Sequence, residues 1–242
     1  MAKKLNSPLK KKPLREPGQT LNEAFNKLVY LGLYTWIVAS IMLVALSLME
    51  WFYWLMNLTL HPAVISVITG AVLLLTVMQY HRVKREARII RLGQQGELVV
   101  GQSLEELRAH GYQVFHDIPG DGHNIDHVLV GPGGLFVIET KTRRKPGGDA
   151  RVTYDGIHLR VCGQIPDRDP IAQTKAAAQE MKRIIRDGLG LDIQVRPVLV
   201  YPGWFIDPVP DGLGIWILNE KALCSWIRNE HRSLEDVRVT QI

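Results

Sequence analysis

The chain has 242 residues, of which 46% are hydrophobic and 22% charged, and it contains 21 glycines, 13 prolines and 2 cysteines. This composition is typical of an ordered protein with one or two domains, and it excludes a wholly disordered, collagen-like or disulfide-stapled chain. The net charge of +5 is unevenly distributed, because residues 1–91 carry +8 and residues 92–242 carry −3. The high isoelectric point is therefore no evidence for a nucleic-acid-binding surface on the C-terminal part.

Two long runs, residues 28–49 and 62–80, contain no charged side chain. As α-helices they would be about 33 Å and about 28 Å long, close to the roughly 30 Å hydrocarbon core of a bilayer. Neither run shows the polar face that a surface helix of a soluble protein keeps, and together they are too long for a cleaved signal peptide. We therefore expect a transmembrane hairpin.

Basic residues flank this hairpin on both sides. Residues 1–27 form a basic tail and residues 81–91 a basic linker, whereas the connection at residues 50–61 has no lysine or arginine. The aromatic cluster at residues 51–54 is typical of a membrane interface. By the positive-inside bias, we expect a two-span protein of the cell membrane, in contact with the lipid bilayer, with both termini in the cytoplasm.

Residues 92–242 are long enough for one further domain and predict a mixed sheet with helices packed on it. The dipeptide Asp155-Gly156 predicts a two-residue hairpin turn. We expect strands at residues 112–118, 124–130, 135–141, 151–154, 157–161, 194–201 and 214–218, and helices at residues 97–110, 170–187 and 219–230.

Charged residues interrupt three of these apolar elements. By strand alternation, Asp126 shares a face with its apolar neighbours, and so do Glu139 and Lys141 on the next strand. Glu97 lies on the apolar stripe of the first helix. The tight turn at residues 131–134 makes the two strands neighbours, so the carboxylates of Asp126 and Glu139 could meet.

This set of residue types suits metal-assisted hydrolysis. Carboxylate oxygens are preferred ligands of Mg²⁺, which lowers the pKa of a bound water and shields charge on a phosphoryl group. Asp126 and Glu139 would hold Mg²⁺ or Mn²⁺, Lys141 would stabilise developing charge, and Glu97 would orient a water or share the metal. An internal salt-bridge network on a partly exposed sheet face explains the same pattern equally well.

Three segments resemble a known family: GQQGE (93–97), NIDHVLVGPGGLFVIETKT (124–142) and DPIAQ (169–173). They are similar to the NERD (nuclease-related) domain of the PD-(D/E)XK, restriction-endonuclease-like superfamily. The resemblance implies an α/β fold for residues 92–242, with a restriction-endonuclease-like mixed sheet and flanking helices. It does not extend to the transmembrane hairpin of residues 28–80, which precedes this domain and is inferred from the uncharged runs. The resemblance also implies a divalent-metal nuclease centre.

The resemblance assigns site residues one by one. Asp126 matches the first acid of the motif, although Ile125 stands where the motif has proline. Glu139 and Lys141 match the (D/E)xK pair. Glu97 matches the helix glutamate and Gln173 a polar position seen in several branches.

A basic cluster follows the third strand, and it consists of Arg143, Arg144, Lys145 and Arg151. It could hold nucleic-acid phosphates, or it could be a solvated loop. His123 and His127 flank Asp126, but alternation directs His127 away from it and no cysteine cluster accompanies them, so we expect no zinc site.

The sequence thus predicts a membrane-anchored nuclease that hydrolyses DNA phosphodiester bonds with Mg²⁺ or Mn²⁺. The alternative is a non-catalytic, membrane-tethered module that binds nucleic acid or protein on a nuclease-like fold.

Overall fold

The computed structural model describes residues 15–57, 62–120, 124–146, 150–210, 212–231 and 234. The chain divides into two compact units. One is Thr20–Leu92, and the other combines Gly93–Ile242 with the N-terminal segment Met1–Gln19.

The first unit consists of long apolar helices. They are α1 (Gln19–Val29), the π-helical turn η1 (Tyr30–Tyr34), α2 (Thr35–Leu55) and the first part of α3 (Ala63–Glu105). The two continuous helical stretches have mean hydropathies of 2.1 and 2.0, and only 6% of the residues in their apolar windows are buried. Both helices are therefore long and apolar enough to span a membrane, and their side chains are not packed as those of a soluble core helix would be.

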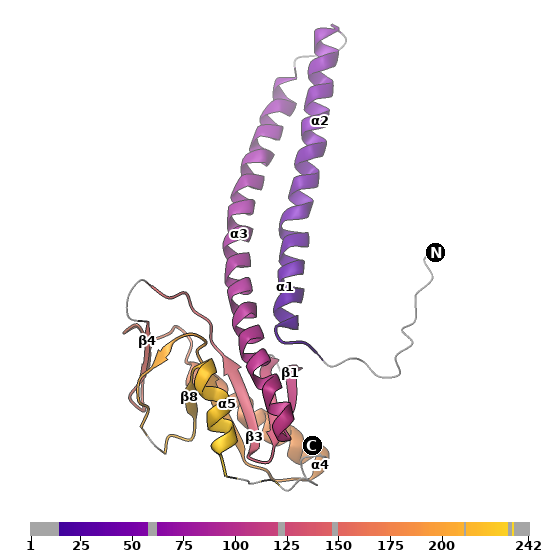
Figure 1. Ribbon diagram of the computed structural model, residues 1–242. Helices are drawn as coiled ribbons and strands as arrows, with labels where there is room; N and C mark the ends of the chain where they lie inside the picture. Colours follow the sequence, from indigo (N-terminus) through magenta and orange to yellow (C-terminus); the bar gives the residue numbers. More distant parts are fainter. Residues whose placement is uncertain are drawn as a thin grey trace. The chain divides into compact units, whose positions relative to one another are not determined.

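Within this unit, α2 and the first half of α3 run side by side (Figure 1) and are joined by polar contacts. The hydroxyl oxygens of Ser40 and Thr76 lie 2.7 Å apart, and the Trp51 indole donates a hydrogen bond of 2.9 Å to Ser66. Hydroxyl groups between two apolar helices need such partners, since lipid offers none. These contacts define the face along which the two helices pair.

The helix α3 is longer than the sequence suggested. Residues 81–91, which we expected to be a linker, are helical, and α3 continues to Glu105 before a 3₁₀ turn, η2 (Glu106–His110). The linker is rich in arginine and lysine and contains no proline, so nothing in it stops a helix. The expected stop at Gly111 is present, with a left-handed φ of 83°.

A five-stranded mixed sheet organises the second unit, as predicted. Its spatial order is β1-β2-β3-β6-β8, with antiparallel pairing from β1 to β3 and parallel pairing from β3 to β8. The strands are β1 (Gln113–Pro119), β2 (Asn124–Gly131), β3 (Gly134–Thr140), β6 (Val195–Val200) and β8 (Trp216–Leu218).

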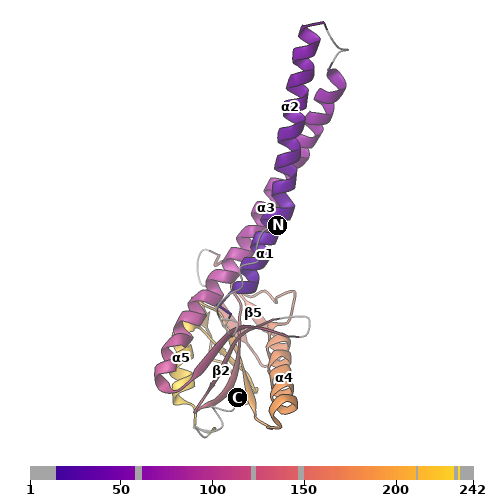
Figure 2. The same cartoon turned by 90° about the vertical axis from the view of Figure 1, so that its right-hand side faces the viewer.

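Helices cover both faces of this sheet, as Figure 2 shows. On one face, α4 (Pro170–Leu189) packs through residues such as Ala177 and Met181. On the other face lie α5 (Glu220–Asn229) and the last turns of α3. Val128 and Val130 of β2 and Leu135 and Val137 of β3 therefore face α4, and alternation puts Glu139 on the same face. Ile125 also joins this core, so alternation in β2 is broken next to Asp126, which reaches the end of β3 through a hydrogen bond from the Thr140 N–H.

A second sheet of three short strands was only partly predicted. Its order is β5 (Leu159–Val161), β4 (Arg151–Tyr154), β7 (Phe205–Ile206), and β7 is too short to give a sequence signal. Because Tyr154 pairs with Leu159, the connecting loop has four residues, and the prediction of a two-residue turn is wrong. Asp155 stabilises the longer loop by accepting hydrogen bonds from two backbone N–H groups, those of Ile157 and His158.

Candidate active site

The centre of the candidate site is the place where β2 and β3 stop pairing. The register pairs His127 with Ile138, and continuing it by one residue puts Asp126 opposite Glu139. Beyond this point the Thr140 N–H donates to the Asp126 carboxylate over 2.7 Å. The Lys141 N–H, one residue past β3, extends the pairing with β6 by donating to Val200 over 2.8 Å. The Asp126 side chain thus replaces a backbone acceptor at the point where the two strands stop pairing.

Glu139 is a buried carboxylate of this centre, with 3% of its surface exposed. Its Oε1 accepts hydrogen bonds from Lys141 Nζ at 2.6 Å and from Gln173 Nε2 at 2.8 Å. Gln173 comes from the first turns of α4, which begins at Pro170 after the side chain of Asp169 caps it. Three of the predicted site residues, Glu139, Lys141 and Gln173, therefore meet at one oxygen atom of Glu139.

The second oxygen of Glu139 is different. Oε2 is buried and has no hydrogen-bond partner among the described residues. An unpaired buried carboxylate oxygen is costly, because it has lost its hydration without replacement. Such an atom is suited to bind a cation.

Glu97 is buried at the end of α3 that belongs to this unit. Burial, together with the nearby charges of Asp117 and Glu139, raises the pKa of Glu97 to about 7. Burial, followed by the charges of Glu139 and Glu97, also raises the pKa of Asp126 well above its usual value. The centre therefore holds more negative charge than Lys141 alone compensates.

Asp117 is a further buried carboxylate that our sequence reasoning missed. Its Oδ2 lies 2.7 Å from the Arg15 guanidinium, and its Oδ1 accepts a hydrogen bond of 2.9 Å from Asn124. The left-handed φ of 51° at Asp117 interrupts the pairing of β1 with β2. The signal was present, since Asp117 interrupts the predicted strand at residues 112–118 much as Asp126 interrupts the next one.

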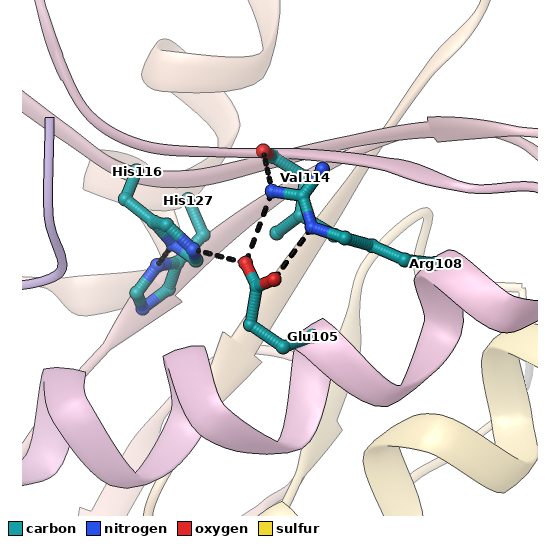
Figure 3. A network of polar contacts seen from close by, with 5 residues as sticks. All are labelled: Glu105, Arg108, Val114, His116 and His127. Carbon is teal, nitrogen blue, oxygen red and sulfur yellow. Dashed lines mark hydrogen bonds and ion pairs between the residues drawn. The ribbon is translucent and has the colours of Figure 1, made fainter. Parts of the chain in front are cut away.

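The histidines near Asp126 form a separate network on the other face of β2 (Figure 3). His127 is fully buried, and its Nδ1 lies 2.8 Å from Nδ1 of His116, whose Nε2 lies 2.9 Å from Glu105. Arg108 ties Glu105 to the backbone oxygen of Val114. Burial and the neighbouring His116 lower the pKa of His127 to about 3, so it is neutral at physiological pH. His123 lies outside the described residues.

The four basic residues proposed to hold phosphates fall into two groups. Arg143, Arg144 and Lys145 follow β3 directly, are exposed, and form no ion pair within the described part of the chain. Arg151 lies on β4, where its guanidinium is 2.6 Å from Asp207 and 5.0 Å from the ring centre of Phe205. The first group is open to a ligand, whereas the charge of Arg151 is already paired.

The donor set fits a small divalent cation. Among the described residues, no group of three or more His, Cys, Asp or Glu side chains is arranged to hold a metal. Mg²⁺ does not require such a cage, because it keeps several waters and often takes only one or two carboxylates. Glu139, through the oxygen that has no partner among the described residues, and Asp126, whose pKa is raised by burial and nearby carboxylates, would be two such ligands.

Comparison with known proteins now identifies the family. Residues 92–202 match the family model described as the nuclease-related domain, NERD. The chain carries a NERD domain. All five residues that we assigned by resemblance to this family, Glu97, Asp126, Glu139, Lys141 and Gln173, lie inside the NERD match.

Two solved structures are similar to the chain at a distance. Pyrococcus furiosus SfsA in complex with Ca²⁺ has 16% identity and a TM-score of 0.26, over 52% of this chain and 54% of that one. Protein VC1899 from Vibrio cholerae has 13% identity and a TM-score of 0.32, over 91% of this chain and 59% of that one. The matches thus span little more than half the length of each structure. Comparison with curated proteins gives no match.

Proposed function

We propose that this NERD protein is a membrane-anchored nuclease that hydrolyses DNA phosphodiester bonds with Mg²⁺ or Mn²⁺. One observation carries the proposal: one oxygen of Glu139 is hydrogen-bonded to Lys141 and Gln173, while the other is buried and has no partner among the residues that the structure describes. Asp126 supplies the second carboxylate, and its side chain accepts a hydrogen bond from the Thr140 N–H at the end of β3.

The roles of the residues follow from these contacts. Asp126 and Glu139 would hold the divalent ion, which when bound lowers the pKa of a water and shields charge on the phosphoryl group. Gln173 fixes the orientation of the Glu139 carboxylate through its amide. Lys141 keeps a positive charge beside the centre, where it would stabilise the negative charge that builds up on a phosphoryl oxygen.

The substrate is inferred from the residues that follow β3. Arg143, Arg144 and Lys145 are exposed directly after the strand that carries Glu139 and Lys141. Residues 92–242 carry a net charge of −3, so this local cluster is where a phosphate backbone would be attracted. We favour DNA over RNA, and the assay below distinguishes them.

The alternative is a non-catalytic module that binds nucleic acid or protein. The contacts among Glu139, Lys141 and Gln173 would then be a structural network with no ion in it. Calorimetry with Mg²⁺ and Mn²⁺ separates the two possibilities. A nuclease centre binds the ion and loses that binding in Asp126→Ala, whereas a structural network binds no ion.

The decisive experiment is a cleavage assay on the full chain in detergent, with double-stranded DNA, single-stranded DNA and RNA in parallel. We expect cleavage of DNA that requires the metal and is lost in Glu139→Ala and Lys141→Ala. Matched controls are Glu106→Ala and Lys182→Ala, because both side chains belong to the same unit and lie outside the centre. Absence of cleavage, or cleavage unaffected by the first two substitutions, would refute the proposal.

Membrane anchoring rests on the two apolar helical stretches and on the basic residues that flank them. With both termini in the cytoplasm, the exposed thiol of Cys162 faces the cell interior. A membrane-impermeant maleimide should therefore label Cys162 only after the cells are permeabilised, and the protein should stay in the membrane fraction at high salt. Labelling in intact cells, or release by salt, would contradict this topology.

A further inference from the structure

The short segment before α1 lies on the nuclease unit. Arg15, Pro17 and Gly18 precede the first apolar helix in sequence, yet Met1–Gln19 belongs to the same compact unit as Gly93–Ile242. Gly18 is buried and has a left-handed φ of 70°. The segment therefore has a defined path across the unit.

Arg15 anchors this segment through the buried carboxylate of Asp117. Its Nε and a terminal nitrogen lie 2.8 Å and 2.7 Å from the same oxygen, Oδ2. Only 4% of the Asp117 side chain is exposed, against 30% of the Arg15 side chain, so the carboxylate of this ion pair is shielded from water. Asp117 in turn lies close enough to Glu97 for its charge to act on that carboxylate.

Gly18 makes the second contact. Its backbone N–H lies close enough to the Glu97 carboxylate to favour the charged form and lower the pKa of that group. A β-carbon at Gly18 would lie 3.0 Å from Cγ of Gln94, so the close approach to α3 depends on glycine at this position.

Pro17 makes the third contact, with Gly101 of α3. A β-carbon at Gly101 would lie 2.6 Å from Cγ of Pro17 and 3.5 Å from the ring of His116. A glycine on each side thus allows the segment and the helix to approach closely. The contacts at Gln94 and Gly101 lie on either side of Glu97 along α3.

We propose that the segment Arg15–Gly18 is a positioning element of the candidate centre, which holds the Glu97 carboxylate in place from outside the NERD domain. The inference rests on the proposed nuclease function. It means that the residues before the hairpin and the residues after it build one site together. A fragment that begins after the hairpin would lack the donor that orients Glu97.

Hydrogen exchange on the full chain in detergent tests the contact without any need for activity. We expect the Gly18 amide to be protected, and Glu97→Ala and Arg15→Ala each to accelerate its exchange at least about tenfold. Glu16→Ala is the control, because Glu16 is exposed and contributes only backbone groups to the turn. A Gly18 amide that exchanges freely in the wild type, or is unaffected by Glu97→Ala, would overturn the inference.

Cleavage kinetics test the consequence. Arg15→Ala should lower kcat about tenfold, the effect of one lost orienting hydrogen bond, at an unchanged KM. Arg15→Lys should retain most of the activity, because a lysine can still pair with Asp117. Gly18→Ala leaves no buried charge unpaired and should lower kcat similarly. It keeps the test valid in case Arg15→Ala misfolds because Asp117 has lost its partner.

The possible results are distinguishable. If the wild type cleaves and both Arg15→Ala and Gly18→Ala keep its kcat, the segment is only a structural clamp and the inference is wrong. If the wild type does not cleave at all, the proposed nuclease function fails, while the exchange of Gly18 still decides whether the segment holds Glu97.

Discussion

Gly96 of α3 and Thr142, just beyond β3, lie so close together that a β-carbon on the glycine would overlap the threonine hydroxyl. This contact brings the helix turn of Glu97 against the end of the strand that carries Glu139 and Lys141. It also explains the second glycine of GQQGE, whose role is to allow close packing of helix and strand.

Gly96→Ala should therefore be destabilising, although alanine is the better helix former. The added methyl group must displace either α3 or Thr142, and overpacking of this kind costs about 1–3 kcal/mol in the free energy of unfolding. The matched control is Gly188→Ala in α4, where a β-carbon would meet nothing within 4 Å. That substitution should be neutral or stabilising by up to about 1 kcal/mol. Denaturant unfolding of the two variants measures the difference, and equal effects would contradict the close contact.

Asp126→Asn should stabilise the metal-free protein and abolish its activity. The pKa of Asp126 is raised by burial and by Glu139 and Glu97, which means that its charged form destabilises the fold at neutral pH. Neutralising this side chain should raise the melting temperature in EDTA by a few degrees, as expected for a gain of about 1 kcal/mol in the free energy of unfolding.

The control for this effect is Asp192→Asn, because the pKa of Asp192 is lowered by the hydrogen bond from Lys182. Asp192→Asn should give no stabilisation. Mg²⁺ should raise the melting temperature of the wild type, since a ligand that binds only the folded state stabilises it, and should leave Asp126→Asn unchanged. A wild-type melting temperature that does not respond to Mg²⁺ would speak against a metal centre.

Much of the site could be predicted, because charged residues in apolar strands stand out locally. The turn at residues 131–134 made the strands of Asp126 and Glu139 neighbours, and alternation placed Glu139 on the face that α4 covers. The contacts that were missed are non-local. Nothing in the sequence near Arg15 indicates that it pairs with Asp117, 102 residues away, and helix periodicity cannot show that the Gly18 N–H lies close to Glu97. The two-residue strand β7 likewise forms only because β4 lies beside it.

The lowered pKa of His127 leads to a prediction about how the stability of the fold depends on pH. In the folded chain the pKa of His127 is about 3, against 6.5 for an unperturbed histidine. Between these values the unfolded chain binds a proton that the folded chain excludes, so the contribution of His127 to stability is lost as the pH falls from about 6.5 towards 3. The slope from this one group is at most about 1.4 kcal/mol per pH unit.

His127→Asn isolates this effect. Asparagine places a polar atom near the position of Nδ1, so the contact with His116 can be kept while the titration is removed. Glu97, whose raised pKa of about 7 acts in the opposite direction, is present in both proteins and cancels in the comparison. Denaturant unfolding from pH 7 to pH 5 should therefore show a steeper loss of stability in the wild type. Parallel curves for the two proteins would show that His127 does not titrate on unfolding.

The basic residues after β3 give a prediction about substrate binding. Simultaneous replacement of Arg143, Arg144 and Lys145 by alanine should weaken binding of duplex DNA and flatten its dependence on salt. Each lost phosphate contact reduces the slope of log K against log salt by about 0.9, so three contacts give about 2.7. Arg151→Ala should change the slope much less, because Asp207 already neutralises that guanidinium. Fluorescence anisotropy with labelled DNA, in the Glu139→Ala background to prevent cleavage, measures both slopes. A larger effect from Arg151→Ala would contradict this prediction and indicate that DNA binds along the second sheet rather than at the residues after β3.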